Sequence, residues 1–456
     1  MADVVTPAPE PTEIVPVSAA ERISSIDVLR GTALLGIAIM NIIFSGLPMA
    51  ADFNPKVSGG ATGPNLAAFF LQYVLFDGKF RGIFSIMFGA SSYYLVTRAV
   101  KRGAGIEAAE VYYRRTLWLM LFGMVHAYLI WHGDILYAYA LLGLILFPLH
   151  KARPKWLLVS AGVCVLVMAG FQITRGYHVL RVHEQVVAAE RALAEHKTLT
   201  DDQKSAQTEW ENLRKYVNPT KDDLKKEAGM YSGSYFHLVA KRAELVKEWH
   251  SDPFYMSGWD MFTMMLVGIA FAKTGVLAAQ RSNRFYTIML LCGYGIGLPI
   301  GSTAAYLAYK QGFEPLQTVF VFTTYQAARI AMTLGHVASL LLICKAGVLA
   351  GLQRRLAAVG QTALSNYIAH SLVYGLVFYG YGFNLFGKLQ RYQLYYVVLG
   401  LWVFSLVASP MWLAHYRFGP LEWCWRSLTY WKRQPMRLVE ETAPDAAELG
   451  AAQTAS

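Results

Sequence analysis

The sequence predicts an all-α, polytopic helical membrane protein with about ten transmembrane helices and a helical extracytoplasmic cap. Of its 456 residues, 55% are hydrophobic and only 16% are charged, whereas about a quarter of a soluble domain is charged. The apolar residues also form long blocks, and about 20 apolar residues cross a bilayer core roughly 30 Å thick. Finally, the short breaks between the blocks are basic, as cytoplasmic loops of membrane proteins are.

Ten apolar segments are long enough for us to expect spans. Residues 65–77 ("NLAAFFLQYVLFD") are too short to cross, so we expect an interfacial or re-entrant helix there. The ten expected spans are residues 27–46, 80–98, 115–131, 134–150, 156–174, 258–279, 285–308, 321–345, 362–381 and 393–415.

The distribution of Lys and Arg predicts the orientation of these spans. Alternate short loops are rich in both residue types, while the turn "WHGD" has neither, which places both termini in the cytoplasm. The one long loop then falls outside, where helical periodicity with alternating charge indicates a helical cap that "VNPTKDD" breaks and restarts. The expected domains are a disordered tail (1–21), a membrane bundle (22–174), the extracytoplasmic loop (175–257), a second membrane bundle (258–430) and a cytoplasmic tail (431–456).

The net charge of +11 is explained by these loops, so we expect the lipid bilayer and no nucleic acid as a partner. The four cysteines form no CxxC pair, and we expect neither a disulfide framework nor a metal site. No Walker A loop, GxSxG elbow or HExxH motif is present. The oligomeric state is left open.

Polar residues inside the apolar spans are the candidate functional residues, because ionisable groups at such depth usually face a cavity or each other. In the first span, Arg30 and Asn41 fall nearly on one helical face with Asp27 close to it. The alternative is that Asp27 and Arg30 pair and only anchor the helix, and that Asn41 bonds a neighbouring helix. Further candidates at helical spacing are Arg329 with His336 and Asn366 with His370. We expect Arg30, Asn41, Arg329 and His336 to share one polar interior.

Two further groups stand at ends of spans. Asp77, Lys79 and Arg81 alternate charge where the second span begins on the outer side, either as site residues or as a helix start with snorkelling cations. His126 and Asp134 flank a short turn, so the third and fourth spans are antiparallel neighbours and the carboxylate lies near the imidazole. Alternatively, Asp134 only caps the fourth helix and His126 is a hydrogen-bonded core residue.

Six motifs in order, from about residue 22 to 430, resemble the YeiB-like family of bacterial inner-membrane proteins, which is largely of unknown function. They are "IDVLRGTALLGIAIMNI", "FDGKFRGIFSIMFGASSYYL", "RRTLWLMLFGMVHAYLIWHGDILYAYALLG", "GSYFHLVAKR", "GQTALSNYIAHS" and "GPLEWCWRSLT". The resemblance implies a multi-pass protein of the bacterial inner membrane. It also implies a distant likeness to membrane acyltransferases that move acyl groups from cytoplasmic coenzyme A thioesters to extracytoplasmic sugars.

The resemblance therefore suggests acyl-CoA as a donor substrate, no tightly bound cofactor, and a small-molecule or glycan acceptor. Acyl transfer to a hydroxyl needs a base, and we expect His126 in that role with Asp134 orienting it. A second hypothesis is a transporter or flippase for a polar small molecule or a lipid-linked substrate, although no inverted repeat is evident. A third is a scaffold or sensor without chemistry.

Overall fold

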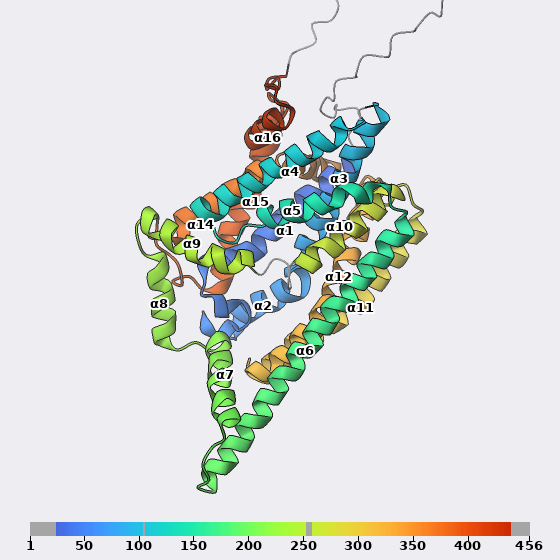
Figure 1. Cartoon of the computed structure of the whole chain (residues 1–456). Helices are drawn as coiled ribbons and strands as arrows, with labels where there is room; N and C mark the ends of the chain where they lie inside the picture. The colour runs from blue at the N-terminus through green and yellow to red at the C-terminus, as the bar shows by residue number, and fades with distance from the viewer. Residues whose placement is uncertain (1–23, 104, 252–257, 439–456) are drawn as a thin grey trace, which may run out of the picture.

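The described part of the chain is helical throughout. The computed structural model describes residues 24–103, 105–251 and 258–438, and within them we find no β-strand, only an isolated bridge between Tyr416 and Arg437 (Figure 1). The expected all-α class is confirmed. The expected tail 1–21 lies outside the described residues.

Within the described residues, six helical passages are long and apolar enough to cross a membrane, which makes the chain a multi-pass membrane protein. The other expected spans are helical but shorter or interrupted: α10 (Gly258–Lys273) and α14 (Ala363–Phe378) have 16 residues each, about 24 Å of helix. The six passages are Ser24–Gly46 (α1), Gly63–Lys101, Pro154–Ala194 (α6), Asn283–Lys310 (α11), Val319–Ala346 within α12 (Pro315–Ala346) and Arg391–Leu413 (α15).

The second passage is broken in its middle. It consists of α2 (Gly63–Leu71), a π-turn η3 (Gln72–Phe76) and α3 (Lys79–Lys101), with the break at Asp77 and Gly78. Gly78 has φ +68°, a left-handed conformation that glycine adopts without strain. The Phe80 ring lies where a Cβ on Gly36 would be, so α3 begins beside the middle of α1. The expectation that the second span begins on the outer side at residue 80 was therefore wrong, because the segment 65–77 supplies its first half.

The third and fourth expected spans form a hairpin. α4 (Glu107–Val125) continues into a second π-turn, η4 (His126–Ile130), and the chain then turns back into α5 (Leu136–Leu146) and a 3-10 turn, η5 (Phe147–Lys151). The expected antiparallel pairing of these segments is confirmed by the contacts between α4 and α5.

The expected cap is helical, but its first part continues a membrane helix. α6 (Pro154–Ala194) runs without interruption for 41 residues, about 60 Å, so no break occurs at residue 174. The next two helices each begin at a threonine whose side chain caps the helix, and "VNPTKDD" restarts the helix as expected. These two helices are α7 (Asp201–Val217) and α8 (Lys221–Tyr231), and α9 (Tyr235–Ser251) completes the cap.

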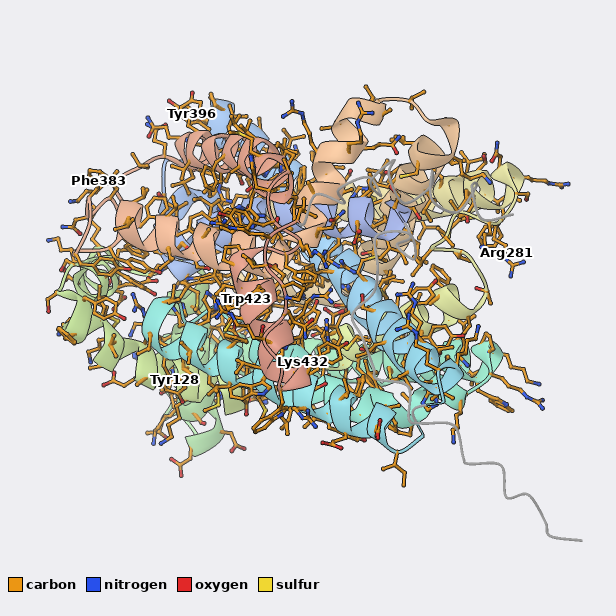
Figure 2. The ribbon with its side chains drawn as sticks, turned by 90° about the horizontal axis from the view of Figure 1, so that it is seen from above. Tyr128, Arg281, Phe383, Tyr396, Trp423 and Lys432 are labelled. Atoms are coloured by element: carbon orange, nitrogen blue, oxygen red, sulfur yellow. The ribbon has the colours of Figure 1, made fainter. Side chains whose placement is uncertain are left out.

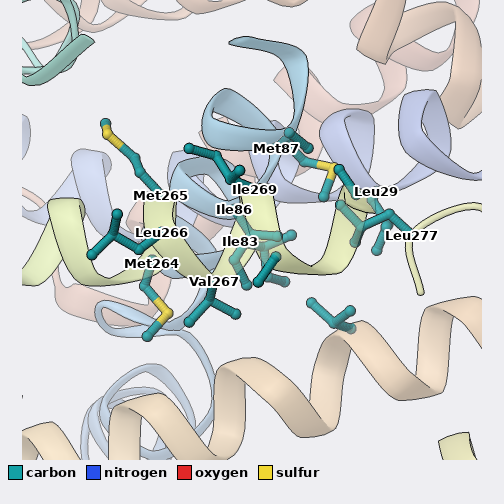
Figure 3. Packing of buried hydrophobic residues seen from close by; sticks show 14 of the residues in the cluster. Leu29, Ile83, Ile86, Met87, Met264, Met265, Leu266, Val267, Ile269 and Leu277 are labelled. Atoms are coloured by element: carbon teal, nitrogen blue, oxygen red, sulfur yellow. The ribbon is translucent and has the colours of Figure 1, made fainter. Parts of the chain in front are cut away.

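Helices from both expected bundles share the same core. α10 packs lengthwise on α3 in the same direction, since Arg81 contacts Asp260 near their first turns and Tyr94 contacts Ala272 near their ends. Figure 3 shows this packing, with Met264 to Ile269 of α10 against Ile83, Ile86 and Met87 of α3 and Leu29 of α1. On the other side of the core, α6, α11 and α12 lie side by side as long helices (Figure 1).

Two ends of the bundle can be distinguished. α16 (Pro420–Tyr430) lies across one end, where Figure 2 shows Trp423 and Lys432 over the centre of the bundle; we call this the α16 face. At the other end, two short 3-10 turns follow α1, η1 (Met49–Asp52) and η2 (Pro55–Val57). Met49 N donates to Glu227 of α8, and Asn54 Nδ2 donates to Val217 O at the end of α7; we call this the cap face. The start of the expected tail 431–456 folds back on α16, because Trp423 Nε1 donates to Gln434 O at 2.7 Å.

The backbones of α1 and α13 (Ala350–Gln361) approach each other closely. A Cβ added at Gly31 would lie 2.0 Å from Leu356 O, and one added at Gly360 would lie 2.0 Å from Asp27 O. Small residues at such crossings let helix backbones touch inside a membrane. This contact fixes the start of α1 against the start of α14, which follows α13 directly.

Replacing Gly360 by Ala is expected to force these backbones apart and to destabilise the protein by about 1–3 kcal/mol, the usual cost of overpacking. A fall in melting temperature in detergent would register this. The matched control is Gly295→Ala on α11, where an added Cβ meets nothing within 4 Å. Equal melting temperatures for the two variants would contradict the assigned contact.

Candidate functional site

A cavity of about 270 Å³ lies inside the bundle beneath α16. Its walls come from α1, α3, α4, α5, α13, α14 and α16, which lie in distant parts of the sequence. Trp425, Arg426 and Tyr430 of α16 line it at the α16 face, and Leu136, Tyr139 and Tyr367 line it deeper in the bundle. We call these last three residues the floor of the cavity.

Four arginines line the cavity and face two carboxylates, Asp27 and Glu422, so its walls carry an excess of positive charge. Arg30 binds Asp27 Oδ1 at 2.9 Å and Ser91 Oγ at 3.0 Å. The ion pair that we considered as an alternative thus exists, and it lies in the cavity wall. The four arginines are Arg30, Arg98, Arg115 and Arg426.

α16 is held over the cavity by two contacts. The Arg115 guanidinium stacks on the Trp425 ring at 3.8 Å, and Trp425 Nε1 donates to Arg115 O at 2.9 Å. Glu422 accepts hydrogen bonds from Leu364 N at 2.6 Å and Ser365 N at 3.1 Å, which are orphan donors at the start of α14. Burial raises the pKa of Glu422, while its hydrogen bonds with Ser365 oppose that shift.

His126 and Asp134 form a buried pair directly behind the cavity floor. His126 Nδ1 and Asp134 Oδ1 are 2.8 Å apart, and their side chains are 1% and 0% exposed. Asp134 Oδ2 also accepts from Tyr137 N at 2.7 Å. The expected contact between imidazole and carboxylate is thus present, and Asp134 also caps α5. Nε2 of His126 has no hydrogen-bond partner among the described residues.

The cap covers this pair on its other side. In the π-turn that contains His126, Leu129 O accepts from Arg242 Nη1 at 2.7 Å and from Tyr235 Oη at 3.0 Å, both on α9. His132, in the turn between α4 and α5, is also buried, and burial with the nearby Arg242 and His126 lowers its pKa to about 4. His132 is therefore uncharged near neutral pH.

A second polar cluster surrounds the break in the Gly63–Lys101 passage. Asp260 lies between two cations: Arg81 Nη2 is 2.9 Å from Asp260 Oδ2, and Arg329 pairs with Asp260 Oδ1. Lys79 Nζ donates to Tyr73 O at 2.5 Å and lies over the rings of Tyr73 and Tyr325.

This cluster also includes a histidine. His336 Nε2 is 2.9 Å from Leu75 O in the π-turn η3, and its Nδ1 is 2.9 Å from Tyr294 Oη. Asp77, at the break itself, is partly buried.

The structure does not bring all predicted residues together. Of the four expected to share one interior, only Arg30 lines the cavity, and that prediction is wrong. Arg329 and His336 belong to the cluster at the helix break, because the chain there needs polar partners inside the bundle. Asn41 lies partly buried on α1, outside the cavity lining.

Asn366 and His370 belong to a third place, the contact between α14 and α15. Asn366 Nδ2 donates to Ser409 Oγ at 2.9 Å, and His370 Nε2 lies 3.0 Å from Ser405 Oγ. Both side chains bond serines of α15, so they link the two helices, and both lie outside the cavity lining.

Sequence reasoning missed several of the residues that build these sites. Asp260 is a carboxylate inside an expected span, and its position there would have identified it as a candidate functional residue. Tyr367, Glu422 and Arg426 lie within the motifs "GQTALSNYIAHS" and "GPLEWCWRSLT". Arg98, Arg115 and Arg426 fit the pattern of basic residues near span ends, and that pattern does not distinguish a loop arginine from one in a cavity wall.

Replacing Asp260 by Asn should be strongly destabilising, because it leaves two arginines near one another with no buried carboxylate between them. Breaking a buried ion pair from one side typically costs about 3–5 kcal/mol. Thermal unfolding in detergent measures this, and Asp77→Asn is the control, since Asp77 is in the same cluster but partly exposed. The ion-pair assignment fails if Asp260→Asn unfolds at the wild-type temperature.

Comparison with known proteins places the chain among bacterial proteins of unestablished function. It is 28% identical to the uncharacterized protein YxaH of Bacillus subtilis over 430 residues, which cover 91% of this chain and 96% of YxaH. It is also 28% identical to the uncharacterized protein YeiB of Escherichia coli over 416 residues, which cover 90% of this chain and 96% of YeiB. An uncharacterized 39.9 kDa protein of Bacillus acidopullulyticus is 26% identical over 431 residues, 93% of this chain and 99% of that protein.

No solved structure matches the chain. Residues 271–432 match the family described as "Protein of unknown function (DUF418)". This segment runs from the end of α10 to just beyond α16, so it includes Tyr367, Glu422 and Arg426. The resemblance to YeiB-like proteins is thereby confirmed: residues 271–432 match the DUF418 family, and the chain is distantly homologous to YeiB and YxaH over most of its length.

Proposed function

We propose that the protein is a transmembrane acyltransferase that moves an acyl group from a cytoplasmic acyl-CoA to an extracytoplasmic hydroxyl acceptor such as a sugar. In this proposal the chain crosses the bacterial inner membrane ten times, with both termini and the α16 face in the cytoplasm. The cap (175–257) is then extracytoplasmic. The Lys and Arg pattern of the short loops supports this orientation.

The observation that carries the proposal is an arginine-lined cavity whose floor is backed by a histidine–carboxylate pair. Coenzyme A carries phosphates, and guanidinium groups bind phosphate oxygens with paired, charge-assisted hydrogen bonds. Arg98 and Arg426 are suited to the nucleotide end of the donor at the α16 face. The deeper wall is more apolar, with Leu119, Leu136 and Leu364, and it suits the pantetheine arm and the acyl group.

His126 has the geometry of a general base. Asp134 at Nδ1 fixes the tautomer with the proton on Nδ1 and leaves Nε2 as the acceptor, which is the arrangement of base and orienting carboxylate in catalytic triads. In the proposed reaction, Nε2 takes the proton of the acceptor hydroxyl while its oxygen attacks the thioester carbonyl carbon. The tetrahedral intermediate collapses, the carbon–sulfur bond breaks, and the proton passes from Nε2 to the leaving thiolate.

A transporter or flippase is the second candidate, and one observation favours it. The Gly63–Lys101 passage is interrupted at the middle of the bundle beside Lys79, Arg81 and Arg329, and interrupted helices of this kind form substrate sites in transporters. The two candidates differ in the product. A transporter releases its substrate unchanged, whereas an acyltransferase yields free coenzyme A and an acylated acceptor.

Coenzyme A should stabilise the purified protein in a way that depends on the cavity arginines. Arg426→Gln removes one charged donor from the cavity wall and is expected to weaken binding of coenzyme A about tenfold, the equivalent of one charged hydrogen bond. Isothermal calorimetry measures the affinity. The control is Arg433→Gln on the same face, because Arg433 lies outside the cavity lining. Equal affinities of both variants for coenzyme A would contradict the proposal that the donor binds in this cavity.

His126→Gln should lower acyl transfer by at least about 100-fold, the usual contribution of a general base. Glutamine retains a side-chain amide for Asp134, so the melting temperature should stay near that of the wild type. The control His132→Gln changes the neighbouring buried histidine and should keep most of the activity. Transfer of a radiolabelled acetyl group from acetyl-CoA to sugars on the far side of proteoliposomes is the assay, and full activity of His126→Gln would refute the assignment.

A further inference from the structure

The His126–Asp134 pair is closed off from the cavity in this structure, although the proposed reaction needs both. His126 and Asp134 are absent from the cavity lining, and their side chains are 1% and 0% exposed. A donor that fills the cavity therefore meets the floor and not the imidazole. A side chain of the cavity floor must therefore move before His126 Nε2 can reach a reacting group.

Tyr367 is the shared wall between the two compartments. Its ring lines the cavity, and the centre of that ring lies 5.0 Å from the centre of the His126 ring. Its hydroxyl accepts a hydrogen bond from Ile135 N at 3.3 Å, in the residue that follows Asp134. The other floor tyrosine is held elsewhere: Tyr139 Oη is bound to Ser85 Oγ at 2.6 Å and donates to Arg81 O at 3.2 Å.

We infer that Tyr367 is the gate between the donor cavity and His126 and sets when the imidazole meets the thioester. The inference rests on the proposed function. The hydroxyl contact of Tyr367 with Ile135 N is one long hydrogen bond, so rotation of its side chain breaks one weak hydrogen bond, whereas moving Tyr139 breaks two. An acyl group that reaches the floor displaces the ring and opens Nε2 to the cavity. Tyr367 is thus a positioning residue that acts through His126.

The cap covers the His126–Asp134 pair on the side opposite to Tyr367. Arg242 and Tyr235 hold Leu129 O of the π-turn that contains His126, and Tyr231 of α8 is stacked on Phe386 at 4.1 Å and on Tyr379 at 5.3 Å. The His126–Asp134 pair is thus covered on the cap side as well as on the cavity side. The Tyr367 ring is the barrier on the cavity side.

Cysteine accessibility tests the gate without measuring acyl transfer. The test chain has its four native cysteines replaced by alanine and carries His126→Cys. An anionic methanethiosulfonate reagent is added from the cytoplasmic side of inside-out membrane vesicles. Labelling is expected to be slow with Tyr367 present, at least tenfold faster with Tyr367→Ala, and unchanged within twofold with Tyr367→Phe, which keeps the ring. If Tyr367→Ala does not fold, Tyr367→Leu takes its place.

Two controls make the result specific. Tyr374→Ala removes an equally buried tyrosine from the same helix, one that bonds Ala38 O and does not line the cavity, so it should leave the rate unchanged. Ser92→Cys, in the cavity wall, should react at the same rate in every background and shows that the reagent enters.

Fast labelling of His126→Cys with Tyr367 intact overturns the inference. So does slow labelling in the Tyr367→Ala background while Ser92→Cys still reacts. Failure of the proposed function is a separate result: a wild-type protein that neither binds coenzyme A nor transfers acyl groups loses that function, whatever the labelling rates are.

Discussion

The demand that every buried backbone group find a partner shapes both polar centres of this protein. Inside a bilayer no water replaces a lost hydrogen bond, and the chain leaves regular α-helical bonding at two π-turns, η3 and η4. In η3, Leu75 O is satisfied by His336; in η4, Leu129 O is satisfied by Arg242 and Tyr235. Each irregular turn therefore draws polar side chains from distant helices to its side, and a polar centre lies next to each turn.

The two centres differ in what they leave available. Around η3 the charges largely satisfy each other, because Asp260 lies between Arg81 and Arg329, and the cluster holds α3, α10 and α12 together. Around η4, Nδ1 of His126 is occupied and Nε2 has no partner within the described chain. A buried imidazole with one committed and one uncommitted nitrogen is poised for proton transfer. This contrast is why we place the chemistry at the α4–α5 hairpin and a structural role at the helix break.

Much of the fold follows from the sequence, because long apolar runs and basic breaks report helices and their ends directly. The His126–Asp134 pair was also predictable, since the four-residue turn between their helices leaves few other arrangements. The sequence did not reveal that residues 65–77 and α3 form one passage, because each part alone resembles a complete local element. Nor did it identify Tyr367, since a tyrosine in an apolar span has the same pattern whether it faces lipid, a core or a cavity.

Because α6 is uninterrupted, its length sets the height and the rotation of the rest of the cap relative to the membrane bundle. About half of its roughly 60 Å length exceeds the thickness of a bilayer core, and α7 is attached at its far end. A straight helix transmits rotation as well as height, so one inserted residue would turn everything beyond it by about 100° and lift it by about 1.5 Å. The outer half of α6 should therefore tolerate substitutions far better than changes of length.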